Sequence, residues 1–170
     1  ARVLREAGVP VRDITELTQF PEIMDGRVKT LHPSVYGGLL ARTGIDETVT
    51  TEHDIEWIDL LVVNLYPFES TIAHPDCTIK QAIENIDIGG PAMLRAAAKN
   101  HSRLTVVVEP DDYQRVLDAF ENGEPPDELR QELAVKAFSH TGAYDDTIST
   151  YLSRTYFREA FPTSLALRGI

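Results

Sequence analysis

The stretch ENIDIGGPAMLRAAAKNH, residues 84–101, predicts a loop that runs directly into a helix. Gly89 and Gly90 allow the backbone to approach a ligand closely and to adopt positive φ. Pro91 suits the first position of a helix, where no N–H is needed. Because alanine side chains are short, the helix can pack closely against another element. Its apolar face recurs at helical spacing and consists of Met93, Leu94, Ala97, Ala98 and His101.

Charged residues accompany both ends of this predicted helix. Asp87 comes just before the glycines, where free backbone N–H groups and the positive end of a helix favour an anion. Arg95 and Lys99 lie four residues apart on a polar stripe beside the apolar face, and we expect Lys99 on the buried side. Taken alone, the pattern fits an ordinary helix with an acid at its start, so the rest of the chain must decide.

Composition narrows the class of protein. A chain of 170 residues with 42% hydrophobic residues fits one domain with a real core. The net charge of −11 argues against broad nucleic-acid binding, but not against a small phosphorylated ligand. Cys77 is the only cysteine, which excludes an intramolecular disulfide and suits a reducing cytoplasm. The sequence has no apolar run long enough to span a membrane.

A second notable stretch is MDGRVKTLHP, residues 24–33. It combines the cations Arg27 and Lys29 with the hydroxyl of Thr30, which together suit a phosphate group. A basic surface loop remains an open alternative at this point.

Two apolar runs predict buried parallel strands, IDLLVVNL at 58–65 and RLTVVV at 103–108, and 9–14 is a shorter strand candidate. Ligands in open α/β sheets bind beyond the carboxyl ends of the strands. Asn64 and Tyr66 are therefore well placed for a ligand, although a tyrosine there is more often a packing residue.

Helical patterns alternate with these strands. They cover 46–55, 78–86, 113–120 and 127 to about 160, the last as two helices or one that is broken at Thr141-Gly142. The alternation predicts an α/β fold with three layers, a mostly parallel sheet and C-terminal helices. The sequence contains no P-loop, no dinucleotide-binding glycine motif, no nucleophile elbow and no histidine or cysteine spacing typical of a metal site.

Four blocks together resemble one family. GRVKTLHP (26–33), VVNLYPFE (62–69), IDIGGPAMLRAAAKNH (86–101) and KAFSHTGAYD (136–145) are similar to the IMP cyclohydrolase part of the bifunctional purine-biosynthesis enzymes. Those enzymes also carry AICAR formyltransferase. The resemblance implies a methylglyoxal-synthase-like fold, a homodimer in the intact protein, and closure of FAICAR to IMP with loss of water. It implies no cofactor for this reaction, and a folate only for the formyltransferase part.

The resemblance also implies site residues. The catalytic set would be Lys29, Tyr66, Asp87 and Lys99. The phosphate side of the nucleotide would be held by Arg27, Val28, Lys29 and Thr30. The base side would be lined by Val63, Asn64, Asp87, Ile88, Gly89 and Gly90. One tension remains, because a straight helix from Gly90 to Lys99 is about 13 Å long and would separate Lys99 from Asp87.

The same family pattern divides the chain. Residues 1–126 correspond to the methylglyoxal-synthase-like catalytic domain and 127–170 to a helical extension that leads to the formyltransferase. The resemblance places a strand and a Ser/Gly/Thr-rich loop before Ala1. We therefore expect the 170 residues, expressed alone, to aggregate or to bind IMP poorly.

Two rivals share the predicted fold type. Methylglyoxal synthase would need a different set of acids and a histidine around its phosphate, and that pattern is not found here. A non-catalytic nucleotide-sensing module, like the regulatory domain of carbamoyl phosphate synthetase, would explain the 24–33 stretch. It would leave Lys99 and Tyr66 without a role.

Overall fold

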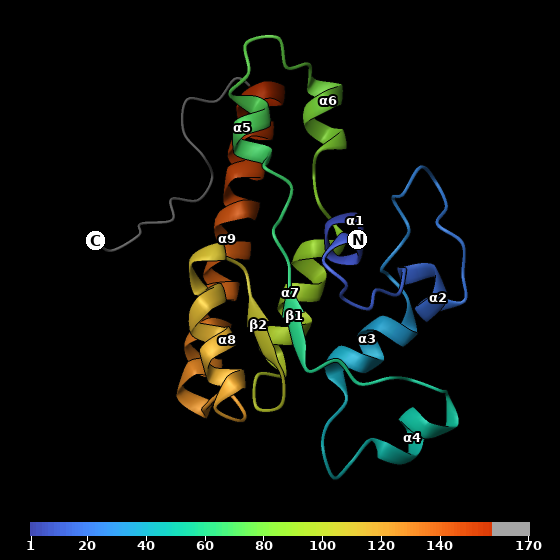
Figure 1. Ribbon diagram of the computed structural model, residues 1–170. Coiled ribbons are helices and arrows are strands. Elements are labelled where there is room, and N and C mark those ends of the chain that lie inside the picture. The colour runs from blue at the N-terminus through green and yellow to red at the C-terminus, as the bar shows by residue number, and fades with distance from the viewer. Residues whose placement is uncertain (158–170) are drawn as a thin grey trace.

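The computed structural model describes residues 1–157. A short parallel sheet lies at the centre, and helices surround it (Figure 1). Along the chain the elements are α1 (Arg2–Glu6), α2 (Ile14–Thr18), α3 (Pro33–Leu40), α4 (Glu47–Glu52), β1 (Leu60–Val62), α5 (Phe68–Ile72), α6 (Ile79–Glu84), α7 (Gly89–Lys99), β2 (Thr105–Val107), the 3₁₀ turn η1 (Pro110–Asp112), α8 (Tyr113–Glu121) and α9 (Asp127–Phe157).

The two strands confirm the prediction of a parallel sheet, in a smaller form than the sequence pattern suggested. β1 pairs with β2 so that Leu61 lies opposite Val106, and α5, α6 and α7 make the crossover between them. β2 is buried throughout, as predicted. β1 is not buried on both faces, because Leu60 and Val62 are 38% and 45% exposed. Within the described residues β2 is the only strand that pairs with β1, so the other edge of β1 has no strand partner there.

The strand predicted at 9–14 is wrong. Residues 9–13 form no regular element, and Ile14 begins α2. Pro10 has no N–H to give to a strand ladder, which disfavours a strand at this point. Val9 is 46% exposed, so the apolar residues that suggested a buried strand are not all in the core.

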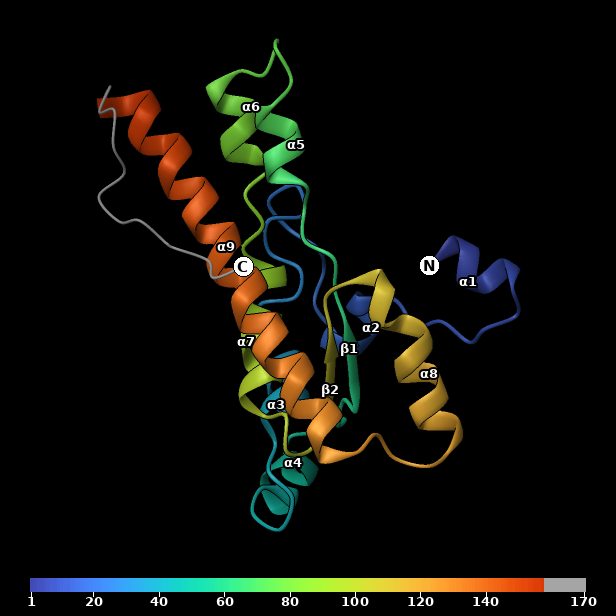
Figure 2. The same ribbon diagram turned by 90° about the vertical axis from the view of Figure 1, so that its left-hand side faces the viewer.

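Helices cover both faces of the sheet. Figure 2 shows α7 and α9 on one side of the strands and α8 on the other. The core lies where these elements meet, and it includes Leu94, Ala97, Leu104, Val106 and Leu133. Ala97 is fully buried, which confirms that the alanine face of α7 packs closely. α7 therefore packs against α9, α3 and the sheet, and these contacts hold both ends of the helix in place.

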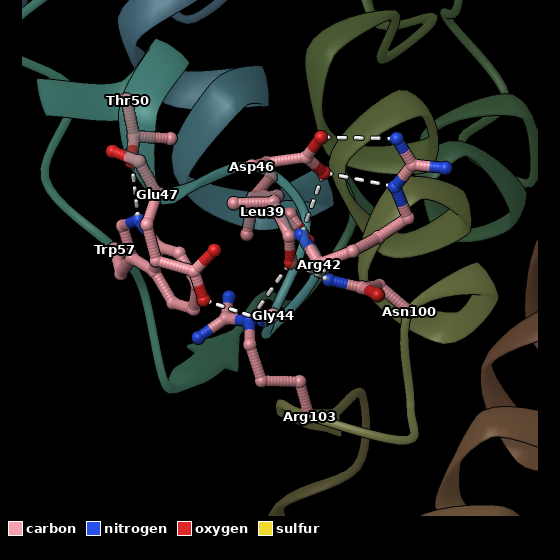
Figure 3. Close-up of polar contacts among 10 residues, drawn as sticks. Leu39, Arg42, Gly44, Asp46, Glu47, Thr50, Trp57, Asn100 and Arg103 are labelled. Carbon is pink, nitrogen blue, oxygen red and sulfur yellow. Dashed lines mark hydrogen bonds and ion pairs between the residues drawn. The ribbon is translucent and has the colours of Figure 1, made fainter. Parts of the chain in front are cut away.

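The C-terminal end of α7 is fastened to α3 by polar contacts (Figure 3). The Asn100 amide donates hydrogen bonds to the carbonyl oxygens of Leu39 and Ala41, both at 2.9 Å. Arg103 donates to the Ala41 carbonyl at 3.1 Å, and its guanidinium lies 4.9 Å from the centre of the Trp57 ring. These side chains satisfy carbonyl groups at the end of α3 that have no helical partner.

α9 is one uninterrupted helix of 31 residues over the described chain, so the predicted break at Thr141-Gly142 is wrong. Thr141 is fully buried, and its hydroxyl donates to the carbonyl of Phe138. A single helical glycine costs only about 1 kcal/mol, which packing along a long helix can offset. The predicted end near residue 160 lies outside the described residues.

Replacing Asn100 tests how strongly this joint holds the fold. Asn100→Ala leaves two buried carbonyl groups without their donor, and we expect a loss of about 2–3 kcal/mol in the free energy of unfolding. Urea unfolding followed by Trp57 fluorescence measures it. Asn122→Ala is the matched control, because the exposed Asn122 amide also donates to a carbonyl, that of Asp118. We expect the control to lose about 0.5 kcal/mol or less. Equal losses in the two variants would contradict this account of the joint.

Candidate active site

A pocket of about 630 Å³ opens between three segments of the chain. They are the loop that precedes α3, the segment that follows β1, and the connection from α6 into α7. Its lining consists of Asp25, Gly26, Arg27, Lys29, Thr30, Leu31, Val63, Tyr66, Ile83, Glu84, Ile86, Asp87, Ile88, Gly89, Gly90 and Met93. Residues from all three sequence blocks, 26–33, 62–69 and 86–101, therefore meet at one place.

A tight turn presents the basic residues to the pocket. Ile23 and Val28 form an antiparallel bridge, and the turn between them has three successive residues of positive φ, at 55°, 53° and 85°. Two of these, Met24 and Asp25, are not glycine, and such a conformation costs roughly 1–2 kcal/mol for each residue. Strained backbone of this kind is common at binding sites. The turn places Arg27 next to the pocket.

Both cations of this loop are already paired with carboxylates. The Arg27 guanidinium donates to the two carboxylate oxygens of Glu84 at 3.1 and 2.7 Å, and it lowers the pKa of Glu84. The Lys29 ammonium lies 3.1 Å from a carboxylate oxygen of Glu22. All four side chains are at least 42% exposed. Exposed ion pairs are weak, so a phosphate group can compete with both carboxylates.

The start of α7 forms a close-packed corner of the pocket. The Asp87 carboxylate accepts a hydrogen bond of 2.8 Å from the Gly90 N–H, as expected for an acid at a helix start. A Cβ atom on Gly90 would lie 2.5 Å from that carboxylate and 2.7 Å from a methyl group of Leu65. A Cβ atom on Gly89 would lie 2.6 Å from the Thr30 hydroxyl. Glycine is needed at both positions because a side chain there would collide with these neighbours.

Two details of the sequence-based description of this corner are wrong. Neither Gly89 nor Gly90 has positive φ. Pro91 is the third residue of α7, not the first, because the helix already begins at Gly89. The missing N–H of Pro91 still costs no hydrogen bond there, since the first turn of a helix leaves its N–H groups free.

Three tyrosines, Tyr36, Tyr66 and Tyr144, lie near the pocket or near Asp87. Tyr66 is 59% exposed at the pocket lining, where a ligand could order it. Burial raises the pKa of Tyr36 and the nearby Asp87 carboxylate adds to the rise, so this phenol stays neutral. The Tyr36 hydroxyl is buried without a hydrogen-bond partner among the described residues. Tyr144 contacts the backbone of Asp87 from α9.

Not every residue expected at the site lines the pocket. The lining includes Arg27, Lys29, Thr30, Val63, Tyr66, Asp87, Ile88, Gly89 and Gly90, and it does not include Val28, Asn64 or Lys99. The side chain of Asn64 donates to the Val108 carbonyl at 2.9 Å and accepts from the Tyr113 hydroxyl at 3.0 Å. It therefore ties the ends of the two strands together.

Lys99 lies away from the rest of the expected catalytic set. It is the last residue of α7 and is exposed, so the expectation of a buried-side lysine is wrong. α7 is one continuous helix, and its length places Lys99 about 15 Å from Gly89. The separation of Lys99 from Asp87 that the helix length predicted is therefore present in the structure.

Sequence reasoning missed several residues of the site. Glu22 and Glu84 pair with the basic loop, yet nothing in their local sequence marks them as partners. Glu84 is 57 residues from Arg27, so only the fold brings them together. Tyr144 lies in the block 136–145, where its helical spacing predicts a core-facing residue and not a residue of the site.

The described part of the chain has neither a cluster of metal ligands nor a helix suited to crossing a membrane. No three side chains of His, Cys, Asp or Glu gather there in a way that would hold a metal ion. None of the helices in residues 1–157 has both the length and the apolar character that crossing a membrane requires.

Comparison with known families agrees with this geometry. A family model described as an MGS-like domain matches residues 1–92, which is more than half of the chain. The chain belongs to the MGS-like domain family. A second model, described as the AICARFT/IMPCHase bienzyme, matches residues 97–169 of this MGS-like protein.

Individual relatives confirm the resemblance seen in the sequence blocks. The MGS-like chain is 58% identical over 155 residues to the bifunctional purine biosynthesis protein PurH of Xanthomonas oryzae, covering 90% of this chain and 29% of that protein. PurH of Xanthomonas euvesicatoria is 55% identical over 166 residues, covering 96% and 32%. The chain thus spans about a third of the length of these relatives.

A solved structure is also similar. The crystal structure of ForH matches the MGS-like chain with a TM-score of 0.77 and 39% identity, covering 91% of this chain and 81% of ForH. The fold described above is therefore shared with an experimentally determined protein.

Gly90→Ala tests the close-packed corner. The added methyl group would displace the Asp87 carboxylate or Leu65, and overpacking of this kind costs about 1–3 kcal/mol. We expect the free energy of unfolding to fall by that amount in chemical denaturation. Gly142→Ala is the matched control, because a Cβ atom there meets nothing within 4 Å and the residue is exposed in α9. The control should gain about 0.5–1 kcal/mol. A Gly90→Ala protein as stable as its parent would contradict the close packing described for this corner.

Proposed function

We propose that this chain is the IMP cyclohydrolase part of a bifunctional purine-biosynthesis enzyme, and that its pocket closes the ring of FAICAR to give IMP. One observation carries the proposal. A single pocket gathers the carboxylate of Asp87, the cations of Arg27 and Lys29, and the phenol of Tyr66, from three separate segments. The identity of 58% to PurH proteins supports the same activity.

The reaction explains why these groups are needed. The carboxamide nitrogen of FAICAR attacks the formyl carbon, a C–N bond forms, and the formyl oxygen gains negative charge. That oxygen takes up two protons, one lost by the attacking carboxamide nitrogen and one lost by the formamide nitrogen, and leaves as water. A C=N bond forms between the formamide nitrogen and the former formyl carbon. A carboxamide is a poor nucleophile, so the site must hold it near the formyl carbon, stabilise the developing oxyanion and move protons.

The residues fall into two groups around the nucleotide. Arg27, Lys29 and Thr30, with the backbone of Val28, hold the phosphate side after Glu22 and Glu84 release the two cations. The base side lies against Val63, Asp87, Ile88, Gly89 and Gly90, where the absence of Cβ atoms on the glycines leaves the backbone open to close approach. Asn64, which the resemblance also implies here, lies outside the pocket lining and supports this side only through the ends of the strands.

The contact at the corner supports the role of Asp87, and the roles of the other residues rest on their motifs. One oxygen of Asp87 accepts the Gly90 N–H, which fixes the carboxylate and leaves the other oxygen for proton transfer. Lys29 stabilises the developing oxyanion. Tyr66 orients the amide or the formyl group. The ring closure uses no cofactor in this proposal, and a folate serves only the formyltransferase part.

Lys99 is included in the catalytic set only because its sequence motif resembles that of the family. We propose that it handles protons together with Asp87, although it is exposed and a helix length from the corner. Lys99 then has to reach the ligand from a second copy of the chain or after a rearrangement. The proposed assembly is a homodimer in the cytoplasm, in which 1–126 is the catalytic domain and 127–170 leads to the formyltransferase.

Turnover of FAICAR to IMP, followed by absorbance in the intact protein, tests the function. We expect Asp87→Asn and Lys99→Ala to lower kcat by about 10²-fold or more with a smaller change in KM, as for proton-transfer groups. Lys29→Ala should impair both, because this lysine also faces the phosphate. Lys80→Ala, a change at a lysine outside the pocket lining, serves as the control and should keep parental rates.

The outcomes separate the alternatives. A parent protein that binds IMP but never forms it from FAICAR would be a nucleotide-sensing module. A Lys99→Ala variant with full turnover would remove Lys99 from the catalytic set. If both variants are inactive, mixing Asp87→Asn and Lys99→Ala subunits shows where Lys99 acts. Regained activity requires that one subunit gives Lys99 to the pocket of the other.

A further inference from the structure

The block KAFSHTGAYD, residues 136–145, lies on α9 and has no role in the reaction described so far. Its Tyr144 hydroxyl accepts a hydrogen bond of 2.9 Å from the backbone N–H of Asp87. The same hydroxyl donates to the carbonyl oxygen of Asn85 at 3.3 Å. One side chain from α9 thus binds the main chain on both sides of Ile86, just before the corner that carries the Asp87 carboxylate.

The ring of Tyr144 is held as firmly as its hydroxyl. It packs edge-on against Phe68, with 6.2 Å between the ring centres and an angle of 71° between the ring planes. Phe68 is fully buried and begins α5, two residues after Tyr66. Tyr144 therefore touches two of the three segments that line the pocket, the one that carries Tyr66 and the one that carries Asp87. α9 also packs along α7, so the hydroxyl is carried by a long, well-supported helix.

The chemistry of the phenol fits this double contact. Burial raises the pKa of Tyr144, and the hydrogen bond from the Asp87 N–H offsets part of the rise. The neutral hydroxyl can accept one hydrogen bond and donate another at the same time. A buried backbone N–H that loses its partner carries a free-energy cost, so the Asp87 main chain has a reason to stay at this hydroxyl.

We propose that Tyr144 is a positioning residue, which holds the main chain of Asp87 so that the carboxylate keeps its place in the pocket. The catalytic part of this inference rests on the proposed function. Tyr144 is not among the residues that line the pocket. Its hydroxyl acts through Asp87. Because Tyr144 belongs to α9, this helix also helps to orient the site.

Tyr144→Phe removes only the hydroxyl and keeps the ring against Phe68. Tyr151→Phe is the matched control, because Tyr151 lies on the same helix and packs on the same Phe68 at 5.7 Å. Within residues 1–157 the Tyr151 hydroxyl makes no side-chain hydrogen bond. In the intact protein we expect Tyr144→Phe to lower kcat by about tenfold, because the hydroxyl no longer holds the Asp87 N–H, with KM changed less than kcat. Tyr151→Phe should leave both unchanged.

A double variant shows whether the effect passes through Asp87. If it does, Tyr144→Phe adds no further loss to Asp87→Asn, because the group that the hydroxyl positions no longer transfers protons. Losses that multiply, or a change in KM alone, would overturn the positioning role.

A second readout does not depend on turnover. Amide hydrogen exchange read by NMR should show the Asp87 N–H protected in the parent and in Tyr151→Phe, and about tenfold less protected in Tyr144→Phe. Unchanged protection in Tyr144→Phe would overturn the proposal. If the parent does not convert FAICAR, the proposed function fails, and the exchange data still decide whether Tyr144 holds Asp87.

Discussion

The close approach of Asp87, Gly90 and Leu65 is the contact on which the candidate site depends. The Asp87 carboxylate is fixed by the Gly90 N–H, and a Cβ atom on Gly90 would collide with both neighbours. α7 can therefore begin directly beside the segment that follows β1. This places the positive end of a helix, an acid and open backbone at one wall of the pocket. Thr30 completes the same wall, because Gly89 leaves room for its hydroxyl.

The other end of α7 keeps this corner in place. Asn100 and Arg103 hold the end of α3, while the fully buried Ala97 lets the helix lie close to its neighbours. A helix fixed at both ends cannot shift along its axis without breaking buried hydrogen bonds. The position of Asp87 thus depends on residues more than ten positions away, and Tyr144 adds a support from a third element. The pocket is a property of the whole α3–α7–α9 arrangement.

Periodicity and residue type allowed much of this to be predicted. The apolar face of α7, the buried strand β2 and the short loop with Arg27 follow from local patterns. Local patterns do not reveal which distant side chain fills a space. The sequence pointed to glycines at 89–90 but not to Leu65 as the reason, and it gave no hint that Glu84 would pair with Arg27. The length of the predicted helix already indicated that Lys99 lies far from Asp87, and the structure adds that its side chain is exposed, so its motif and its position disagree.

The central claim is that this one pocket holds the nucleotide, and a crystal structure of the protein with bound IMP tests it most directly. The account predicts the phosphate within hydrogen-bond distance of Arg27, Lys29 and Thr30, with Glu22 and Glu84 released, and the base against Gly89 and Gly90 beside Asp87. IMP bound elsewhere, for example in the neighbouring 500 Å³ cavity lined by His140, would contradict the account.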